Sequence, residues 1–173
     1  QITDVKQTLD LWKGAVNSNF KLNGTPVEVQ TVCHPEADML AAVVRSAAHP
    51  AVNFRFPYPT GGHCDDACKW DANDRHSTTI VSQDGQQVVL KRTLDATTYY
   101  VTIRWEGKAL FGEKDKNYFV LTPEEDTLAF TCAFTPEGAS TETATAVQTE
   151  QKAAEYWTAF WKNGAAIDFS ACT

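Results

Sequence analysis

Residues 57–76 bring together the side chains with which this chain could do chemistry. The segment holds two histidines, four aspartates, two cysteines, a tryptophan and an arginine. It is long for a loop in a compact domain, and loops of that length are usually functional or disordered. These residue types could form three kinds of site: a metal centre, an acid–base pair or a sugar-binding edge.

A zinc site is the first possibility. Zinc in proteins takes four nitrogen or sulfur ligands, and a permitted Cys-x3-Cys spacing with two histidines is present in His63, Cys64, Cys68 and His76. Two observations speak against it: thiols of secreted proteins usually oxidise, and the chain contains no Cys-x2-Cys pair. We therefore expect neither a metal nor another cofactor in this chain.

Acid–base catalysis is the second possibility, with Asp65 or Asp66 acting beside His63 or His76. A carboxylate is tuned for proton transfer only in a shaped, partly dry pocket, which a sequence does not reveal. The chain also has no glycine-rich phosphate loop, no Gly-x-Ser-x-Gly elbow and no His-Glu-x-x-His motif. We therefore expect no catalytic residue here.

Sugar binding is the third possibility, because aspartate and amide groups hold hydroxyls while an indole offers a face for stacking. The candidate residues are Tyr58, His63, Asp65, Asp66, Trp70 and His76. A purely structural interpretation competes with it. In that case a Cys64–Cys68 disulfide closes the loop, Arg75 pairs with an aspartate, and no ligand binds.

The elements that must position this segment are mainly β-strands, indicated by alternating apolar and polar residues between turn residues. The expected strands are residues 27–33, 39–45, 52–56, 80–83, 86–94, 99–105, 118–121 and 128–134. Asp84-Gly85 is expected to form a two-residue hairpin turn. A helix over 36–48 is the competing interpretation of the second strand. Six to nine strands joined by short turns predict an antiparallel β-sandwich.

The N-terminal region carries a weaker signal. Residues 1–24 show no firm period, so we expect irregular or edge structure there, anchored by Trp12 and Phe20. The chain begins at Gln1, a start made by processing or by design, and loss of a secretory signal is the simplest explanation. A sequon at Asn23 could then carry a glycan. We expect a secreted, extracellular protein.

Residues 138–173 follow the expected β-sandwich domain (1–137) and predict a linker and then an amphipathic helix. The helix could start anywhere from Ser140 to Thr145, where Thr145 and Gln148 would make a capping box. Gly164 is placed to end it. One helical face carries Val147, Ala153, Ala154, Trp157, Phe160 and Trp161. Such a face needs an apolar cover, and we expect its aromatic residues to contact a partner domain or chain.

Composition indicates about one globular domain, with 173 residues, 43% of them hydrophobic and 21% charged. The net charge of −7 argues against nucleic acid and anionic membranes as partners. No apolar run approaches the roughly 20 residues needed to cross a bilayer. Five cysteines leave one thiol free or paired with another chain. Cys33 and Cys132 fall on core-facing strand positions, and Cys172 is the candidate for a bond to a partner.

Three stretches of the sequence resemble a known family. They are VQTVCHP at 29–35, FRFPYPTG at 54–61 with DRHSTT at 74–79, and YW, FW and GAAIDFS within 156–170. They look like the N-terminal β-sandwich (supersandwich-like) and connecting helix of secreted, fungal-type glycoside hydrolases with an (α/α)6 six-hairpin barrel. The resemblance covers most of residues 27–173. It implies a sandwich packed on a barrel that holds the family's catalytic carboxylates, none of which falls on a position of this chain.

These observations together predict a function in carbohydrate metabolism. We expect a non-catalytic β-sandwich segment, or the small chain of a nicked precursor, of a secreted glycoside hydrolase. It would brace the catalytic barrel through the face of Trp157 and Trp161, and lend the 58–76 loop to the substrate cleft. A stand-alone carbohydrate-binding module and a small secreted metalloenzyme using His63 and His76 are the alternatives.

Overall fold

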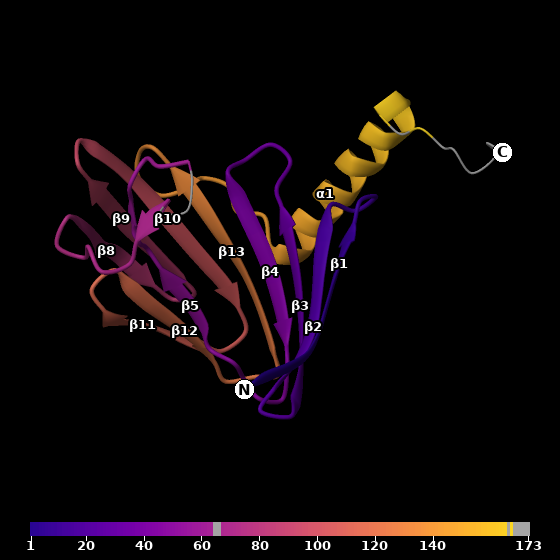
Figure 1. The fold of residues 1–173 in the computed structure, drawn as a ribbon. Helices are drawn as coiled ribbons and strands as arrows, with labels where there is room; N and C mark the ends of the chain where they lie inside the picture. The colour runs from indigo at the N-terminus through magenta and orange to yellow at the C-terminus, as the bar shows by residue number, and fades with distance from the viewer. Residues whose placement is uncertain (64–66, 166, 168–173) are drawn as a thin grey trace.

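The computed structural model describes residues 1–63, 67–165 and 167, and it is mainly β with a helix near the C-terminal end (Figure 1). The strands are β1 (Ile2–Asp10), β2 (Ala15–Leu22), β3 (Thr25–Cys33), β4 (Met39–Arg45), β5 (Val52–Arg55), β6 (Tyr58–Pro59), β7 (Cys68–Lys69), β8 (His76–Asp84), β9 (Gln87–Leu94), β10 (Thr97–Glu106), β11 (Ala109–Asp115), β12 (Tyr118–Pro123) and β13 (Thr127–Thr135). They are followed by helix α1 (Ala146–Phe160) and a short π-helical turn, η1 (Trp161–Ala165).

The strands form two packed antiparallel sheets and a small ribbon. The larger sheet has eight strands in the order β1-β2-β3-β4-β13-β10-β9-β8, the smaller has three in the order β11-β12-β5, and β6 pairs with β7. Apolar side chains from both sheets meet in one core that includes Val88, Leu90, Val101, Ile103, Phe111, Phe119 and Leu121. Burying each of these contributes about 1.5–3 kcal/mol. The predicted antiparallel β-sandwich followed by a C-terminal helix is confirmed.

Strand β4 explains why the pattern of residues 36–48 fitted both a strand and a helix. It lies between β3 and β13, and both of its faces are covered. Ala42 and Val44 belong to the sandwich core, whereas Ala41 and Val43 pack with helix α1. A strand buried on both faces shows a continuous apolar run instead of alternation. The competing helix is therefore wrong.

Residues 1–24 form a regular hairpin, so the expectation of irregular structure is wrong, although an edge position is correct. β1 pairs antiparallel with β2 along most of its length and is an outermost strand of the larger sheet. Its residues are almost all exposed. No core imposes alternation on such a strand, which is why its sequence shows no period. Phe20 packs against the core as expected, whereas Trp12 is 51% exposed and anchors nothing there.

The turn between β8 and β9 is shifted by one residue from the prediction. Asp84 pairs with Gln87, so the two turn residues are Gly85 and Gln86. Gly85 has φ of +52°, the left-handed conformation that a tight hairpin turn needs and that glycine adopts without a steric cost. The hairpin itself is as predicted.

The cysteines agree only in part with the expectation. Cys132 is buried in the core, and this burial raises the pKa of its thiol to about 12. Cys33 is exposed because it is the last residue of β3, so its predicted core position is wrong. Cys68 is a free cysteine. The predicted Cys64–Cys68 disulfide is therefore not formed in the structure. Cys64 and Cys172 lie outside the described residues, and the interchain bond of Cys172 stays a prediction.

Helix α1 packs on the outer face of the larger sheet, opposite the sandwich core. It begins after Thr145, which forms the predicted capping box with Gln148. The predicted Val147 is 53% exposed, and the buried side carries Ala146, Thr149 and Ala153. These small residues meet small residues of the sheet, so helix and sheet approach closely; the sheet residues are Ala15, Val32, Ala41 and Val43. Gly164, with φ of +94°, lies in the turn that ends the helical region, as predicted.

Candidate functional site

The base of the 57–76 segment is a polar network around Tyr58, which is 5% exposed, whereas its partners Arg75 and Asp95 are exposed. Its hydroxyl donates to the carboxylate of Asp95 at 3.0 Å and accepts from Nη2 of Arg75 at 2.8 Å. The guanidinium of Arg75 also lies 4.1 Å from the centre of the tyrosine ring. The hydrogen bond to Asp95 raises the pKa of Tyr58, because the phenolate could not donate it. Arg75 is thus linked to an aspartate through Tyr58, and not directly as predicted, within the described residues.

A second network adjoins the first and surrounds Arg92, which is 1% exposed. Its Nη1 donates to Nδ1 of His76 at 2.7 Å and to Oγ1 of Thr78 at 2.8 Å. An arginine only donates, so Nδ1 accepts and the imidazole proton is on Nε2. Burial, and then the charge of Arg92, lower the pKa of His76. His76 is therefore a neutral partner of a buried cation: Nδ1 is occupied by Arg92, and Nε2, which carries the proton, is buried without a hydrogen-bond partner among the described residues.

The remaining predicted site residues lie apart from these networks. His63 and Trp70 are exposed, while Asp65 and Asp66 lie outside the described residues. Of the six candidates for sugar binding, the structure describes four: a buried pair, Tyr58 and His76, and an exposed pair, His63 and Trp70. Within the described ranges no group of three His, Cys, Asp or Glu side chains is arranged to hold a metal ion.

Trp70 belongs to a stack on the surface that we call the Trp70 platform, consisting of Trp70, Arg55, Tyr118 and Asn53. The guanidinium of Arg55 lies 4.8 Å from the Trp70 ring and 5.2 Å from the Tyr118 ring. The Tyr118 hydroxyl donates to Oδ1 of Asn53 at 2.5 Å. These contacts hold the indole in place while 52% of Trp70 stays exposed. An exposed indole backed by a guanidinium is an arrangement on which a sugar ring can stack.

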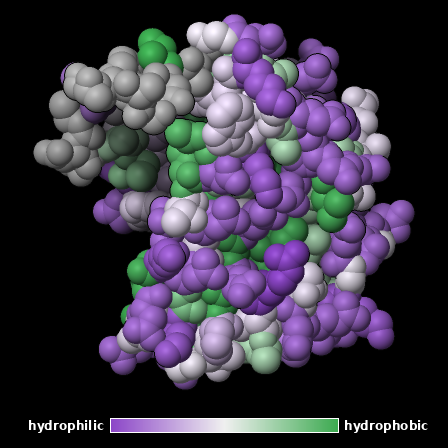
Figure 2. Space-filling view, turned by 90° about the vertical axis from the view of Figure 1, so that its right-hand side faces the viewer, coloured by the Kyte–Doolittle hydropathy of each residue, from purple (hydrophilic) through white to green (hydrophobic). Residues whose placement is uncertain are grey.

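A second candidate site is an exposed apolar region that we call the hairpin–helix surface. Its residues come from the β1–β2 turn and the C-terminal half of α1, and each is between 44% and 55% exposed; they are Leu11, Trp12, Tyr156 and Phe160. Figure 2 views the molecule from the side of β1 and α1 and shows exposed hydrophobic side chains among polar ones. Clusters of exposed apolar side chains usually mark interaction surfaces.

The two tryptophans of the helix are partly covered by the chain itself. Nε1 of Trp161 donates to the carbonyl of Leu11 at 2.6 Å. Trp157 lies against Gly14, where an added Cβ would stand 2.1 Å from Cδ1 of the indole. The turn between β1 and β2 therefore supplies part of the apolar cover that the sequence assigned to a partner. Phe160, with Tyr156, forms the exposed part of that face, and contact with a partner stays a prediction.

The comparison with known proteins identifies the fold. No family model matches the sequence, and no curated protein does. A solved structure of a putative kojibiose phosphorylase from the human microbiome is similar over 94% of this chain, with a TM-score of 0.59 and 10% identity. This chain spans only 25% of that structure. At this identity the likeness shows the fold alone, and in the neighbour the fold is one part of a larger chain.

Two further expectations concern the compartment. No helix among the described residues is both long and apolar enough to cross a membrane. Asn23 lies in the exposed turn between β2 and β3 with φ of +50°, so its side chain is accessible. Glycosylation at Asn23 and secretion stay predictions.

Proposed function

We propose that this chain is a non-catalytic β-sandwich domain of a larger, secreted glycoside hydrolase or related carbohydrate-active enzyme, and that it braces an (α/α)6 catalytic barrel. The hairpin–helix surface carries the proposal. It lies at the end of α1 that projects beyond the larger sheet (Figure 1). The fold shared with a quarter of a putative kojibiose phosphorylase supports it, since there too a larger chain accompanies the sandwich.

The energetics of this surface favour a protein cover. Leu11, Trp12, Tyr156 and Phe160 each leave about half of their side chain in water. Burying the rest of one such side chain would contribute about 1 kcal/mol, and aromatic residues supply most of the energy at protein interfaces. The indole of Trp161 is already fixed by its bond to Leu11, so little ordering would be needed on binding.

Native mass spectrometry of the protein from its source is the first test. A larger covalent chain, or a stoichiometric partner, is expected. A solitary, active monomer of these 173 residues would refute the proposal.

A pair of variants in the intact protein provides the second test. Phe160→Gln should lower its thermal stability and activity, whereas Val147→Gln should change neither. Glutamine is neutral, so the helix dipole does not act differently on the two positions at opposite ends of α1. Val147 is a matched control because it is 53% exposed on the same helix but outside the hairpin–helix surface. Equal effects of the two variants would remove the assignment of this surface to a partner domain.

The Trp70 platform supports a second candidate function, carbohydrate binding by this chain. Glycan-array binding by the 173-residue chain should then be lost in Trp70→Ala. Trp12→Ala is the matched control, because Trp12 is exposed to the same extent, 51% against 52%, on the other candidate surface. Binding that survives Trp70→Ala would exclude the platform.

A further inference from the structure

The outer face of the larger sheet carries one row of side chains that crosses six strands. The strand register places these residues side by side, from β2 through β3, β4, β13 and β10 to β9: Ala15, Val32, Ala41, Thr131, Arg104 and Gln87. The first three are small and apolar and lie under helix α1. The last three are polar, and the helix does not cover them.

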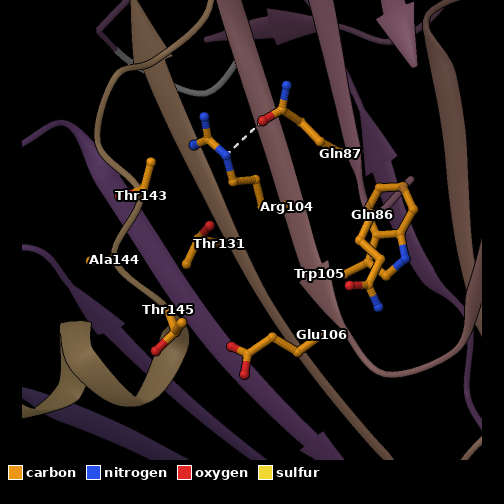
Figure 3. A pocket seen from close by; sticks show the side chains of 9 residues that line it. All are labelled: Gln86, Gln87, Arg104, Trp105, Glu106, Thr131, Thr143, Ala144 and Thr145. Carbon is orange, nitrogen blue, oxygen red and sulfur yellow. Dashed lines mark hydrogen bonds between the residues drawn. The ribbon is translucent and has the colours of Figure 1, made fainter. Parts of the chain in front are cut away.

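These polar residues are the floor of a groove of about 300 Å³ that no part of the proposed function uses. One wall of the groove is formed by linker residues 143–145, which come just before α1. Figure 3 shows the side chains of Arg104, Thr131 and Glu106 on the side of the sheet where the linker passes, whereas the indole of Trp105 lies away from them. Strand alternation explains this difference, because neighbours along a strand face opposite sides.

The linker wall is held in place by Arg104. Nη1 of Arg104 donates to the carbonyl of Glu142 at 2.6 Å, and Nη2 donates to the carbonyl of Ser140 at 2.8 Å. Oγ1 of Thr102 accepts from the amide of Ser140 at 2.9 Å. The groove is therefore already formed without a ligand, which reduces the cost of ordering on binding.

Several groups in the groove have unused hydrogen-bonding capacity. Thr131 is 4% exposed, and no group in the described part of the chain bonds to its hydroxyl. Among the described residues the one buried side-chain polar atom without a hydrogen bond is Nε2 of His76, so the unbonded hydroxyl of Thr131 reaches the groove and is available to a molecule there. Arg104 uses only three of its five N–H groups, the third bonding Oε1 of Gln87 at 2.7 Å. Glu106 accepts a bond from the amide of Ala146 through Oε1, at 3.3 Å.

We propose that this groove binds a neutral mono- or disaccharide. Arg104 and Gln87 offer donors, Glu106 offers an acceptor, and the hydroxyl of Thr131 does both. Sugar hydroxyls also donate and accept, so they match this mixture, whereas a polyanion would be repelled by Glu106 and a polycation by Arg104. The volume is at the lower end of the range of ligand pockets, which suits one or two sugar rings. This inference is independent of the proposed bracing function and of the Trp70 platform.

An NMR titration of the ¹⁵N-labelled chain with D-glucose, and separately with maltose, tests the proposal. Saturable shifts are expected at the amides of Arg104, Glu106, Thr131 and residues 143–145. Thr131→Val should weaken binding by about 3- to 10-fold, because it removes one neutral hydrogen bond and preserves the shape. Thr131→Ser keeps the hydroxyl and should bind nearly as well, which separates loss of the bond from disturbance of the sheet.

Thr127→Val is the matched control, because Thr127 lies at the start of the same strand and outside the groove; it should leave the affinity unchanged. Absence of saturable shifts with both sugars overturns the proposal. Shifts confined to Trp70 and Tyr118 also overturn it, while favouring the platform. If glycine, a zwitterion, produced the shifts and the sugars did not, the assignment of a saccharide would be wrong.

Discussion

Two regions of the molecule place their side chains in opposite ways. At the base of the 57–76 segment, Tyr58, His76 and Arg92 are almost fully buried, with polar groups bonded to one another. At the hairpin–helix surface, Trp12 and Phe160 leave about half of their surface in water. Polar residues of the types that often bind ligands are thus buried here, whereas apolar residues of the types that usually form a core lie on the surface. Residue type alone therefore did not show which side chains are buried and which are exposed.

Arg92→Ala should have the largest effect. It leaves Nδ1 of His76 and Oγ1 of Thr78 buried without the donor that Arg92 supplies, while Asn117 keeps its bond from Thr78, and we expect the free energy of unfolding to fall by about 3 kcal/mol. Urea denaturation measures this. Arg45→Ala, at an exposed strand end, is the control and should change stability by less than about 0.5 kcal/mol. Similar losses in the two variants would mean that an arginine in the buried network contributes no more to stability than an exposed arginine does.

Gly14→Ala should have the next largest effect and tests the other region. The added Cβ would stand 2.1 Å from Trp157 and would also meet the strain of φ at +62°. We expect a loss of about 2 kcal/mol and a changed tryptophan emission spectrum. Gly24 has φ of +89°, and no atom lies within 4 Å of a Cβ added there. Gly24→Ala should therefore lose only the stability that backbone strain costs, about 1 kcal/mol. Equal losses of stability in the two variants would show that the Trp157 side chain can move away from the added methyl group without destabilising the fold.

The pH dependence of stability tests the charge state of the buried network. The folded pKa of His76 lies below 6.5, the unfolded value, because of burial and the nearby Arg92; Lys116 acts in the same direction and Asp74 opposes. Below 6.5 the unfolded chain binds a proton that the folded chain resists, so stability is lost as pH falls. The loss is at most about 1.4 kcal/mol per pH unit.

Urea unfolding of the wild type and of His76→Gln, between about pH 7 and about pH 5.5, isolates this contribution. The variant should lose less stability on acidification than the wild type. His63→Gln, which changes an exposed histidine, should behave as the wild type does. Parallel curves for the wild type and His76→Gln would contradict the neutral assignment.

Thr145→Ala should have the smallest effect. It removes the side-chain acceptor of the capping box at the start of α1 and should cost about 1 kcal/mol. Thermal unfolding measures the loss. Thr143→Ala, two residues earlier in the linker, should be nearly neutral for stability. A neutral Thr145→Ala would indicate that packing on the sheet alone holds the helix.

The fold was largely predictable because its signals are local. The alternation of Val101, Ile103 and Trp105 against polar neighbours identified the central strand β10, and all three are buried. The pairing of Thr145 with Gln148 identified the start of the helix. The pattern was weakest where it does not reflect the environment of the strand. Exposed β1 has no period and was not assigned as a strand, whereas doubly buried β4 was assigned correctly but has so many apolar residues that a helix also fitted.

The candidate sites were predictable only in part. Arg92 was missed, although it follows Val88 and Leu90 at the same two-residue spacing, which placed it on the core face. Asp95 was missed for a different reason: it reaches Tyr58 from 37 positions away in the sequence. The floor of the groove was missed because Gln87, Arg104 and Thr131 become neighbours only through strand pairing.

From the sequence alone came most of the antiparallel strands, though not β1, β2 or β11, together with the capped helix and the position of most turns. Alternation, capping and glycine placement act between residues close in the chain, which is why they can be read there. The tertiary structure decided which side chains are buried and which contact one another. Trp161 meets Leu11 across 150 positions, and no local preference specifies such a contact. Burial and the choice of contact partners depend on how the sheet brings distant segments together.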